Sequence, residues 1–113
     1  MTNDIMNEQR VSKLREFLDA DPEDSFSRFA LALEYLKGGD IKTAQSYFEY
    51  IRDNDPGYVG VYYHLGLLYQ ESGELVKAQK TFVTGISAAR EAREYRAASE
   101  LEQALNEIEP DQI

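Results

Sequence analysis

The residues that could carry acid–base or nucleophilic chemistry are few in this sequence. His64 is the only histidine, and there is no cysteine. His64 is therefore the one side chain whose unperturbed pKa suits proton transfer near neutral pH, and thiolate chemistry is excluded. A serine–histidine–aspartate site could combine Ser72 with His64, but no pattern in the sequence orients them. We interpret His64 as a residue on a helix face and expect no enzymatic activity.

Two acidic segments bear a superficial likeness to calcium-binding loops. "DNDPG" begins at Asp53, and "DADPED" begins at Asp19. A calcium loop of this kind requires a glycine at its sixth position and a glutamate at its twelfth. Tyr58 and His64 occupy those positions in the first segment, and an aspartate and an alanine occupy them in the second. We expect neither a bound metal nor any other cofactor.

The charge of the chain narrows its choice of partners. Twelve basic and twenty-one acidic residues give a net charge of −9. Such a surface repels phosphate backbones, so we expect no nucleic-acid partner. The acidity either steers basic partners toward the protein or serves only to keep it in solution.

Length and hydropathy predict one small domain outside the membrane. The chain has 113 residues, of which 42% are hydrophobic, enough to form a core. No apolar run approaches the roughly 20 residues of a membrane span. The start, "MTNDIMNEQR", lacks the pattern of a signal peptide. Together with the absence of cysteine, these features predict a cytoplasmic protein.

The sequence contains an internal repeat with a period of 34 residues. When residues 23–56 are placed over residues 57–90, seven positions are identical, and they are apolar, small or turn residues. The identical pairs are Leu31/Leu65, Leu33/Leu67, Tyr35/Tyr69, Gly39/Gly73, Ala44/Ala78, Gln45/Gln79 and Phe48/Phe82. Self-similarity at a fixed period of this length indicates a repeat architecture.

Each repeat is predicted to form two helices. Apolar residues recur at spacings of three and four in "SFSRFALALEYLK" (25–37) and "IKTAQSYFEYIRD" (41–53). Between them, Gly39 can adopt the left-handed conformation that closes a helix, and Asp40 can cap the next one. Pro56 ends the second helix because proline disfavours helical geometry in the preceding residue. Gly73 and Glu74 are expected to repeat this scheme.

The two ends of the chain are predicted to be helical as well. "LREFLDADP" aligns with "FEYIRDNDP" at the same shift, so residues 5–19 are expected to form the second helix of an incomplete repeat. Its predicted buried residues are Val11, Leu14, Phe17 and Leu18. At the other end, "AASELEQALNEI" predicts an amphipathic capping helix with a polar outer face. Its predicted buried residues are Ala97, Ala98, Leu101, Ala104, Leu105 and Ile108.

The repeat resembles the tetratricopeptide repeat, a family of 34-residue helix–turn–helix units. The resemblance rests on Leu31, Ala32, Tyr35, Ala44, Phe48 and Pro56, and on Tyr62, Leu65, Gly66, Tyr69, Ala78 and Phe82. The sequence departs from the family pattern at Arg28, Gly85 and Arg90, where an aromatic residue, alanine and proline are usual. The last departure suggests that the final helix of the second repeat extends past the usual turn. The C-terminal end is also similar to those of short, stand-alone bacterial members.

The resemblance implies an all-α fold, a right-handed α–α superhelix of about six helices. We expect a single domain over residues 1–113. Its parts are an N-terminal half-repeat (5–22), a first repeat (23–56), a second repeat (57–92) and a capping helix (93–109).

The resemblance further implies a concave groove lined by the first helix of each repeat. The implied groove positions are Phe26, Phe29, Ala30, Leu33 and Leu36, then Gly60, Tyr63, His64, Leu67 and Gln70, then Arg96, Ser99 and Gln103 in the cap. Family members that grip the acidic tails of chaperones use lysines, asparagines and an arginine there. Phe29, Leu33 and His64 stand at those positions here, so a chaperone-tail adaptor is not expected.

These positions predict a protein–protein interaction module that binds a helical or extended peptide in an apolar half-groove. Two other interpretations remain open. The chain could form a structural homodimer through this groove or an end helix, or the N-terminal segment could cover the groove within the chain. The identity of any protein partner does not follow from the sequence.

The repeat register makes a testable prediction at Ala78, which is expected to lie where two helices approach closely. Replacing Ala78 with leucine would overpack that contact and should lower the free energy of unfolding by about 1–3 kcal/mol. Urea denaturation followed by circular dichroism measures this change. A neutral substitution would contradict the register.

Overall fold

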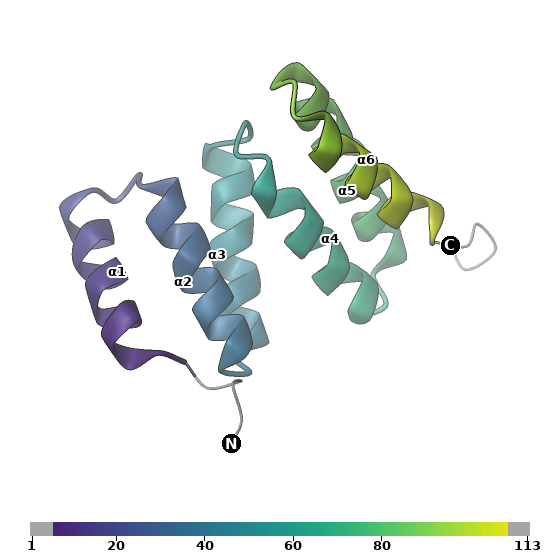
Figure 1. Ribbon diagram of the computed structural model, residues 1–113. Coiled ribbons are helices and arrows are strands. Elements are labelled where there is room, and N and C mark those ends of the chain that lie inside the picture. The colour runs from purple at the N-terminus through teal and green to yellow at the C-terminus, as the bar shows by residue number, and fades with distance from the viewer. Residues whose placement is uncertain (1–5, 109–113) are drawn as a thin grey trace. The chain divides into compact units, whose positions relative to one another are not determined.

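The structure is a computed structural model in which residues 6–108 are described, and these residues form six helices and no strand (Figure 1). The helices are α1 (Glu8–Ala20), α2 (Ser25–Lys37), α3 (Ile41–Asn54), α4 (Gly60–Glu71), α5 (Leu75–Glu91) and α6 (Tyr95–Asn106). The predicted all-α helical-repeat fold is confirmed. The predicted helix start at residue 5 and the predicted end at residue 109 lie outside the described residues. The chain divides into two compact units after Asp55, one holding α1–α3 and the other α4–α6.

Glycines in the left-handed conformation close the first helix of each repeat. Gly39 follows α2 with φ of 85°, and Gly73 follows α4 with φ of 83°. A residue with a Cβ atom is strained in this conformation, whereas glycine adopts it freely. The sequence prediction for these two turns is confirmed. Arg93, which follows α5, has φ of 60° and makes a comparable turn without glycine.

Side-chain caps begin the helices of the first unit. Asp40 accepts a hydrogen bond from the Thr43 backbone N–H at 3.2 Å, as its position predicted. Asp24 caps α2 in the same way through the N–H of Ser27 at 3.1 Å. Glu74 takes the corresponding N-cap position of α5, as predicted, but its side chain makes no capping hydrogen bond there. Its longer side chain forms an ion pair with Lys77 at 3.1 Å instead.

One buried cluster of the first unit forms where α1 packs on α2, and α3 adds the buried residues Ala44, Phe48 and Ile51. Val11, Leu14, Ala30 and Leu31 form one buried cluster, and Leu18 is partly buried against it. The prediction that Phe17 joins the buried stripe of α1 is wrong, because Phe17 is 48% exposed. Phe17 lies at the edge of the stripe, and the Lys13 ammonium lies 5.7 Å from its ring centroid. The three- and four-residue spacing of apolar residues therefore predicted which side of α1 is buried, but it did not predict that Phe17 at the edge of that side is exposed.

A buried carboxylate joins the start of α1 to α2. Glu34 is only 3% exposed, and it accepts a hydrogen bond from the Asn7 backbone N–H at 3.0 Å. Arg10 and Lys37 form ion pairs with it at 3.3 and 3.2 Å. Burial alone would raise the pKa of Glu34, but the Asn7 N–H and the two cations together hold it below its usual range. Glu34 thus stays ionised and satisfied in a buried position.

Arg28, which departs from the family pattern, bridges α2 and α3. Its guanidinium carbon lies 3.8 Å from the ring centroid of Tyr50, a cation–π distance. Arg28 also donates to the Pro22 carbonyl at 2.6 Å. The Tyr50 hydroxyl in turn donates to a carboxylate oxygen of Glu23 at 3.0 Å. A cation stacked on an aromatic ring of the neighbouring helix therefore occupies the place of the usual aromatic residue.

In the second unit, glycines allow α4 and α5 to approach closely. A Cβ atom placed on Gly66 of α4 would lie 2.3 Å from the Phe82 ring. A Cβ atom on Gly85 of α5 would lie 2.5 Å from the Cβ of Tyr62 and 3.1 Å from Leu101. Tyr62, Phe82 and Leu101 are all almost fully buried. Gly85 therefore stands where alanine is usual because the Tyr62 side chain occupies that space.

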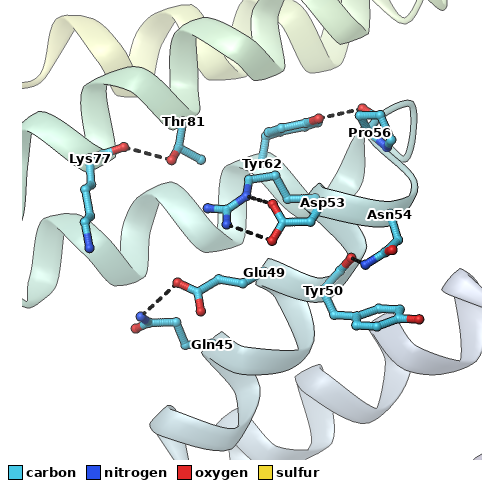
Figure 2. Close-up of polar contacts among 10 residues, drawn as sticks. Gln45, Glu49, Tyr50, Asp53, Asn54, Pro56, Tyr62, Lys77 and Thr81 are labelled. Carbon is cyan, nitrogen blue, oxygen red and sulfur yellow. Dashed lines mark hydrogen bonds and ion pairs between the residues drawn. The ribbon is translucent and has the colours of Figure 1, made fainter.

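A hydrogen bond fixes the Tyr62 ring in this contact. Figure 2 shows the Tyr62 hydroxyl donating to the Pro56 carbonyl oxygen, at a distance of 2.5 Å. The same view shows Thr81 donating to the Lys77 carbonyl one turn earlier in α5, at 2.8 Å. Both hydrogen bonds give a partner to the hydroxyl group of a buried residue. Burying such a hydroxyl group without a partner would cost free energy.

The last two helices agree with the sequence prediction. α5 has 17 residues, whereas α3 has 14, so the helix that lacks the usual proline extends further. α6 packs on α5 and also contacts α4 (Figure 1). The residues of α6 and its end that are buried are Ala98, Leu101, Ala104 and Ile108. Ala97 and Leu105, at the sides of this stripe, are partly buried.

The contact between Gly85 and Tyr62 generates a stability prediction. Gly85→Ala should lower the free energy of unfolding by about 1–3 kcal/mol, because the new methyl group would clash with a Cβ atom close to the α4 backbone. This loss should outweigh the roughly 1 kcal/mol by which alanine favours a helix over glycine. Urea denaturation followed by circular dichroism would measure it.

Gly57→Ala is the matched control for this experiment. No atom lies within 4 Å of a Cβ placed on Gly57, so this substitution should change the free energy of unfolding by less than about 1 kcal/mol. A Gly85→Ala variant as stable as Gly57→Ala would contradict the proposed close contact.

Candidate peptide-binding faces

The predicted site residues of the first unit share one face of α2. Phe26, Phe29 and Leu33 follow one another at spacings of three and four residues. Phe26 is 64% exposed, whereas Phe29 and Leu33 are partly buried. The Phe29 ring lies 5.7 Å from the Phe48 ring of α3, tilted by 53°. This face therefore presents one open aromatic ring beside a ring that is supported from behind.

The N-terminal helix covers a different part of α2. Ala30, which the resemblance implied to face the groove, is buried in the cluster of α1 and α2 with Val11 and Leu14. Phe26 stays open to solvent despite this packing. The N-terminal helix therefore covers Ala30, as one of the interpretations of the sequence proposed for the groove, but it leaves Phe26 accessible to solvent.

In the second unit, the predicted residues lie along α4. Tyr63 is 40% exposed, and His64, Leu67 and Gln70 are partly buried. The rings of Tyr63 and His64 meet edge to face, with centroids 6.0 Å apart and planes at 86°. Burial lowers the pKa of His64 below its ordinary value, because the charged imidazolium is disfavoured there. His64 is therefore neutral at pH 7 and adds no charge beside Tyr63.

Tyr63 also borders a hollow between α4 and α6, which we call the α4–α6 hollow. It has a volume of about 320 Å³. Its lining residues are Tyr63, Glu100, Gln103, Ala104 and Glu107. The sequence identified Tyr63 and Gln103 as groove residues, but it did not identify Glu100 and Glu107. Their spacing of three and four residues from Gln103 was the available signal, since it puts all three on one side of α6.

Arg96, also predicted as a groove residue, lies on a separate surface. It borders a hollow of about 490 Å³ at the start of α6, together with Arg93 and Tyr95. Its side chain is 95% exposed and forms an ion pair with Glu100 at 3.6 Å. An exposed pair of this kind contributes little to stability. The structure does not bring Arg96 into the α4–α6 hollow, although Glu100 borders both.

A third hollow in the second unit was not predicted from the sequence. It measures about 510 Å³ and has a mostly apolar lining. Its lining residues are Pro56, Gly57, Tyr62, Thr84, Ser87, Ala88, Glu91 and Ala92. The small residues of α5 leave this space beside the Tyr62 ring.

Two further features are absent from the part of the chain that the structure describes. Within residues 6–108, no group of three or more histidine, cysteine or acidic side chains is arranged to hold a metal ion. Among the same residues, no helix combines the length and the apolar character needed to cross a membrane.

Comparison with known proteins identifies the family. A sequence profile of the tetratricopeptide repeat matches residues 35–101, more than half of the chain. Two solved structures of a tetratricopeptide repeat domain protein from Salinibacter ruber are similar to this chain. The crystal structure is 43% identical in sequence and has a TM-score of 0.70. The match covers 73% of this chain and 91% of the Salinibacter ruber chain. The solution NMR structure is 45% identical in sequence and has a TM-score of 0.71, and the match covers 75% of this chain and 86% of the Salinibacter ruber chain. The chain belongs to the tetratricopeptide repeat family.

Two curated relatives come from Pseudomonas. Cellulose synthase operon protein C of Pseudomonas fluorescens (strain SBW25) is 36% identical over 67 residues, which are 59% of this chain. The match spans only 5% of that protein's length. A TPR repeat-containing protein of Pseudomonas aeruginosa is 24% identical over 99 residues, 88% of this chain and 94% of the relative.

Membership of this family defines the general class of activity. Tetratricopeptide repeats generally mediate protein–protein interactions, and proteins of the family are generally non-catalytic scaffolds.

The partly buried His64 generates a prediction about pH. Its pKa is lower in the folded chain than the value of about 6.5 in an unfolded one. The unfolded state therefore binds more protons at this group, and the contribution of His64 to stability falls as pH decreases below about 6.5. The slope from this one group cannot exceed about 1.4 kcal/mol per pH unit.

Urea denaturation of the wild type and of His64→Gln at several pH values between 5 and 8 measures this contribution. The wild type should lose stability faster than the variant between pH 6.5 and 5, and the two should run parallel above pH 7. Parallel curves over the whole range would show that burial does not disfavour protonation of His64.

Proposed function

We propose that this chain is a protein–protein interaction module that binds a helical or extended segment of a partner, and that the exposed face of α2 in the first unit and the exposed face of α4 in the second are its candidate contact surfaces. The observation that supports it most directly is the exposure of Phe26 and Tyr63 at implied groove positions. Aromatic side chains supply large contact areas at interfaces. In this proposal, α1 is the half-repeat (5–22), α2 and α3 form the first repeat (23–56), α4 and α5 form the second (57–92), and α6 is the cap (93–109).

The side chains on these faces favour some ligands over others. Phe29, Leu33, Leu67 and Gln70 are uncharged, and His64 is neutral at pH 7. Nothing at these positions would hold the carboxylates of an acidic tail, which require lysine or arginine. The faces suit a segment that carries apolar side chains on one side, such as an amphipathic helix. The absence of cysteine supports a reducing cytoplasm as the place where this binding occurs.

The alternative function is a homodimer, and the exposure of apolar rings on the end helices favours it. Phe17 on α1 and Tyr95 on α6 are 48% and 64% exposed. A symmetric dimer would bury one of these helices, or one of the proposed binding faces, against a second copy of the chain.

Selection from a random-peptide display library tests the proposed binding even while the natural partner is unidentified. Peptides enriched on the wild type should bind Phe26→Ala/Tyr63→Ala at least about tenfold more weakly, since two aromatic anchors are removed. Phe17→Ala is the matched control, because it removes an exposed ring from a different helix and should retain binding.

Circular dichroism should show unchanged helicity in both variants, because Phe17, Phe26 and Tyr63 are exposed. The proposal is wrong if no peptide is enriched, or if the enriched peptides bind the double variant as tightly as the wild type.

A further inference from the structure

The α4–α6 hollow is lined by an aromatic ring, a small apolar side chain and two carboxylates, which we call its acidic rim. Tyr63 of α4 supplies the ring, and Ala104, which is buried, supplies the apolar side chain. Glu100 of α6 and Glu107, the C-cap residue of that helix, are seven residues apart, which is about 10 Å along a helix axis. Gln103 lies between them and offers an amide. Among the described residues that line this hollow there is no lysine or arginine.

The two carboxylates are available to a ligand. Glu107 forms no ion pair with any side chain among residues 6–108. Within the described part of the chain, Glu100 pairs only with Arg96, whose side chain is 95% exposed, and such a pair is weak and exchangeable. His64, whose ring meets the edge of Tyr63, is neutral at pH 7 and does not oppose a cation. The net charge of −9 attracts basic segments toward this surface.

We infer that the α4–α6 hollow binds an arginine side chain of the partner segment, an inference that rests on the proposed function. Arginine combines the two properties that the lining selects. Its planar guanidinium stacks on an aromatic ring, and its several N–H groups pair with carboxylates. The guanidinium would stack on Tyr63 and donate to Glu100 or Glu107, while its aliphatic stem would lie over Ala104.

The first unit already holds this combination of side chains. There the Arg28 guanidinium lies 3.8 Å from the Tyr50 ring centroid, and the Tyr50 hydroxyl donates to Glu23 at 3.0 Å. The α4–α6 hollow presents the tyrosine and the carboxylates without the arginine. A partner's arginine would complete an arrangement that the chain forms internally elsewhere.

A defined peptide tests this inference on the full chain. The blocked pentapeptide N-acetyl-Ala-Ala-Arg-Ala-Ala-amide is titrated into ¹⁵N-labelled protein, and backbone amide shifts are followed by NMR. Shifts should concentrate at Tyr63, Glu100, Gln103 and Glu107. The same peptide with glutamine in place of arginine should produce no such shifts.

Charge-neutral variants of the rim provide the second arm of the test. Glu100→Gln/Glu107→Gln should weaken binding of the arginine peptide roughly fivefold, as expected for the loss of two partly exposed charge pairs. Glu71→Gln/Glu91→Gln changes the net charge equally at residues outside the hollow, and it should bind like the wild type.

Three outcomes would overturn the inference: shifts spread over the whole acidic surface, equal binding by the rim variant and the wild type, or equal shifts with the glutamine peptide. The peptide-display selection distinguishes failure of the arginine site from failure of the proposed interaction module. Enriched peptides that depend on Phe26 and Tyr63 but do not prefer arginine would leave the interaction module standing and refute only the arginine site.

Discussion

The close approach of α4 and α5 is the constraint on which the second unit depends. Each of these helices places a glycine against a large ring of the other, Gly66 against Phe82 and Gly85 against Tyr62. Because both contacts leave no space for a methyl group, the two helices are held in one register and at one distance. Leu101 of α6 reaches the same point beside Gly85, so the position of the cap follows from it.

This constraint also determines what α4 exposes. Tyr62 points into the contact and donates its hydroxyl to Pro56. The next residue, Tyr63, is turned by about 100° around the helix and reaches solvent. Tyr62 therefore stabilises the contact between α4 and α5, whereas the neighbouring Tyr63 is available to a ligand. Tyr63 and the small residue Ala104 both line the α4–α6 hollow.

The sequence predicted the fold well because its signals are local. The glycines at the turns and the Asp40 cap each depend on a few neighbouring residues, and the structure confirms them. The exposure of Phe17 was missed because periodicity shows which residues share a stripe but not where a neighbouring helix stops covering it. Gly85 looked like a simple departure from alanine until the position of Tyr62 explained it.

The candidate site was less predictable, because it depends on which faces of separate helices come together. Glu100 and Glu107 belong to a polar face of α6 that reads as solvent-exposed in the sequence. Only the packing of α6 beside α4 shows that Tyr63 lies opposite them. Ala30 illustrates the converse, since a residue at an implied groove position is buried by α1.

The central claim is that the faces bearing Phe26 and Tyr63 are open in the free protein and available to a partner. The absolute mass in solution, measured by light scattering over a wide range of protein concentration and at low and high salt, tests it most directly. A constant mass of 12.9 kDa is the predicted result, since it leaves both faces uncovered. A mass of twice that value that returns to the monomer mass in Tyr63→Ala would show that a second copy of the chain already occupies this surface, and it would contradict the claim.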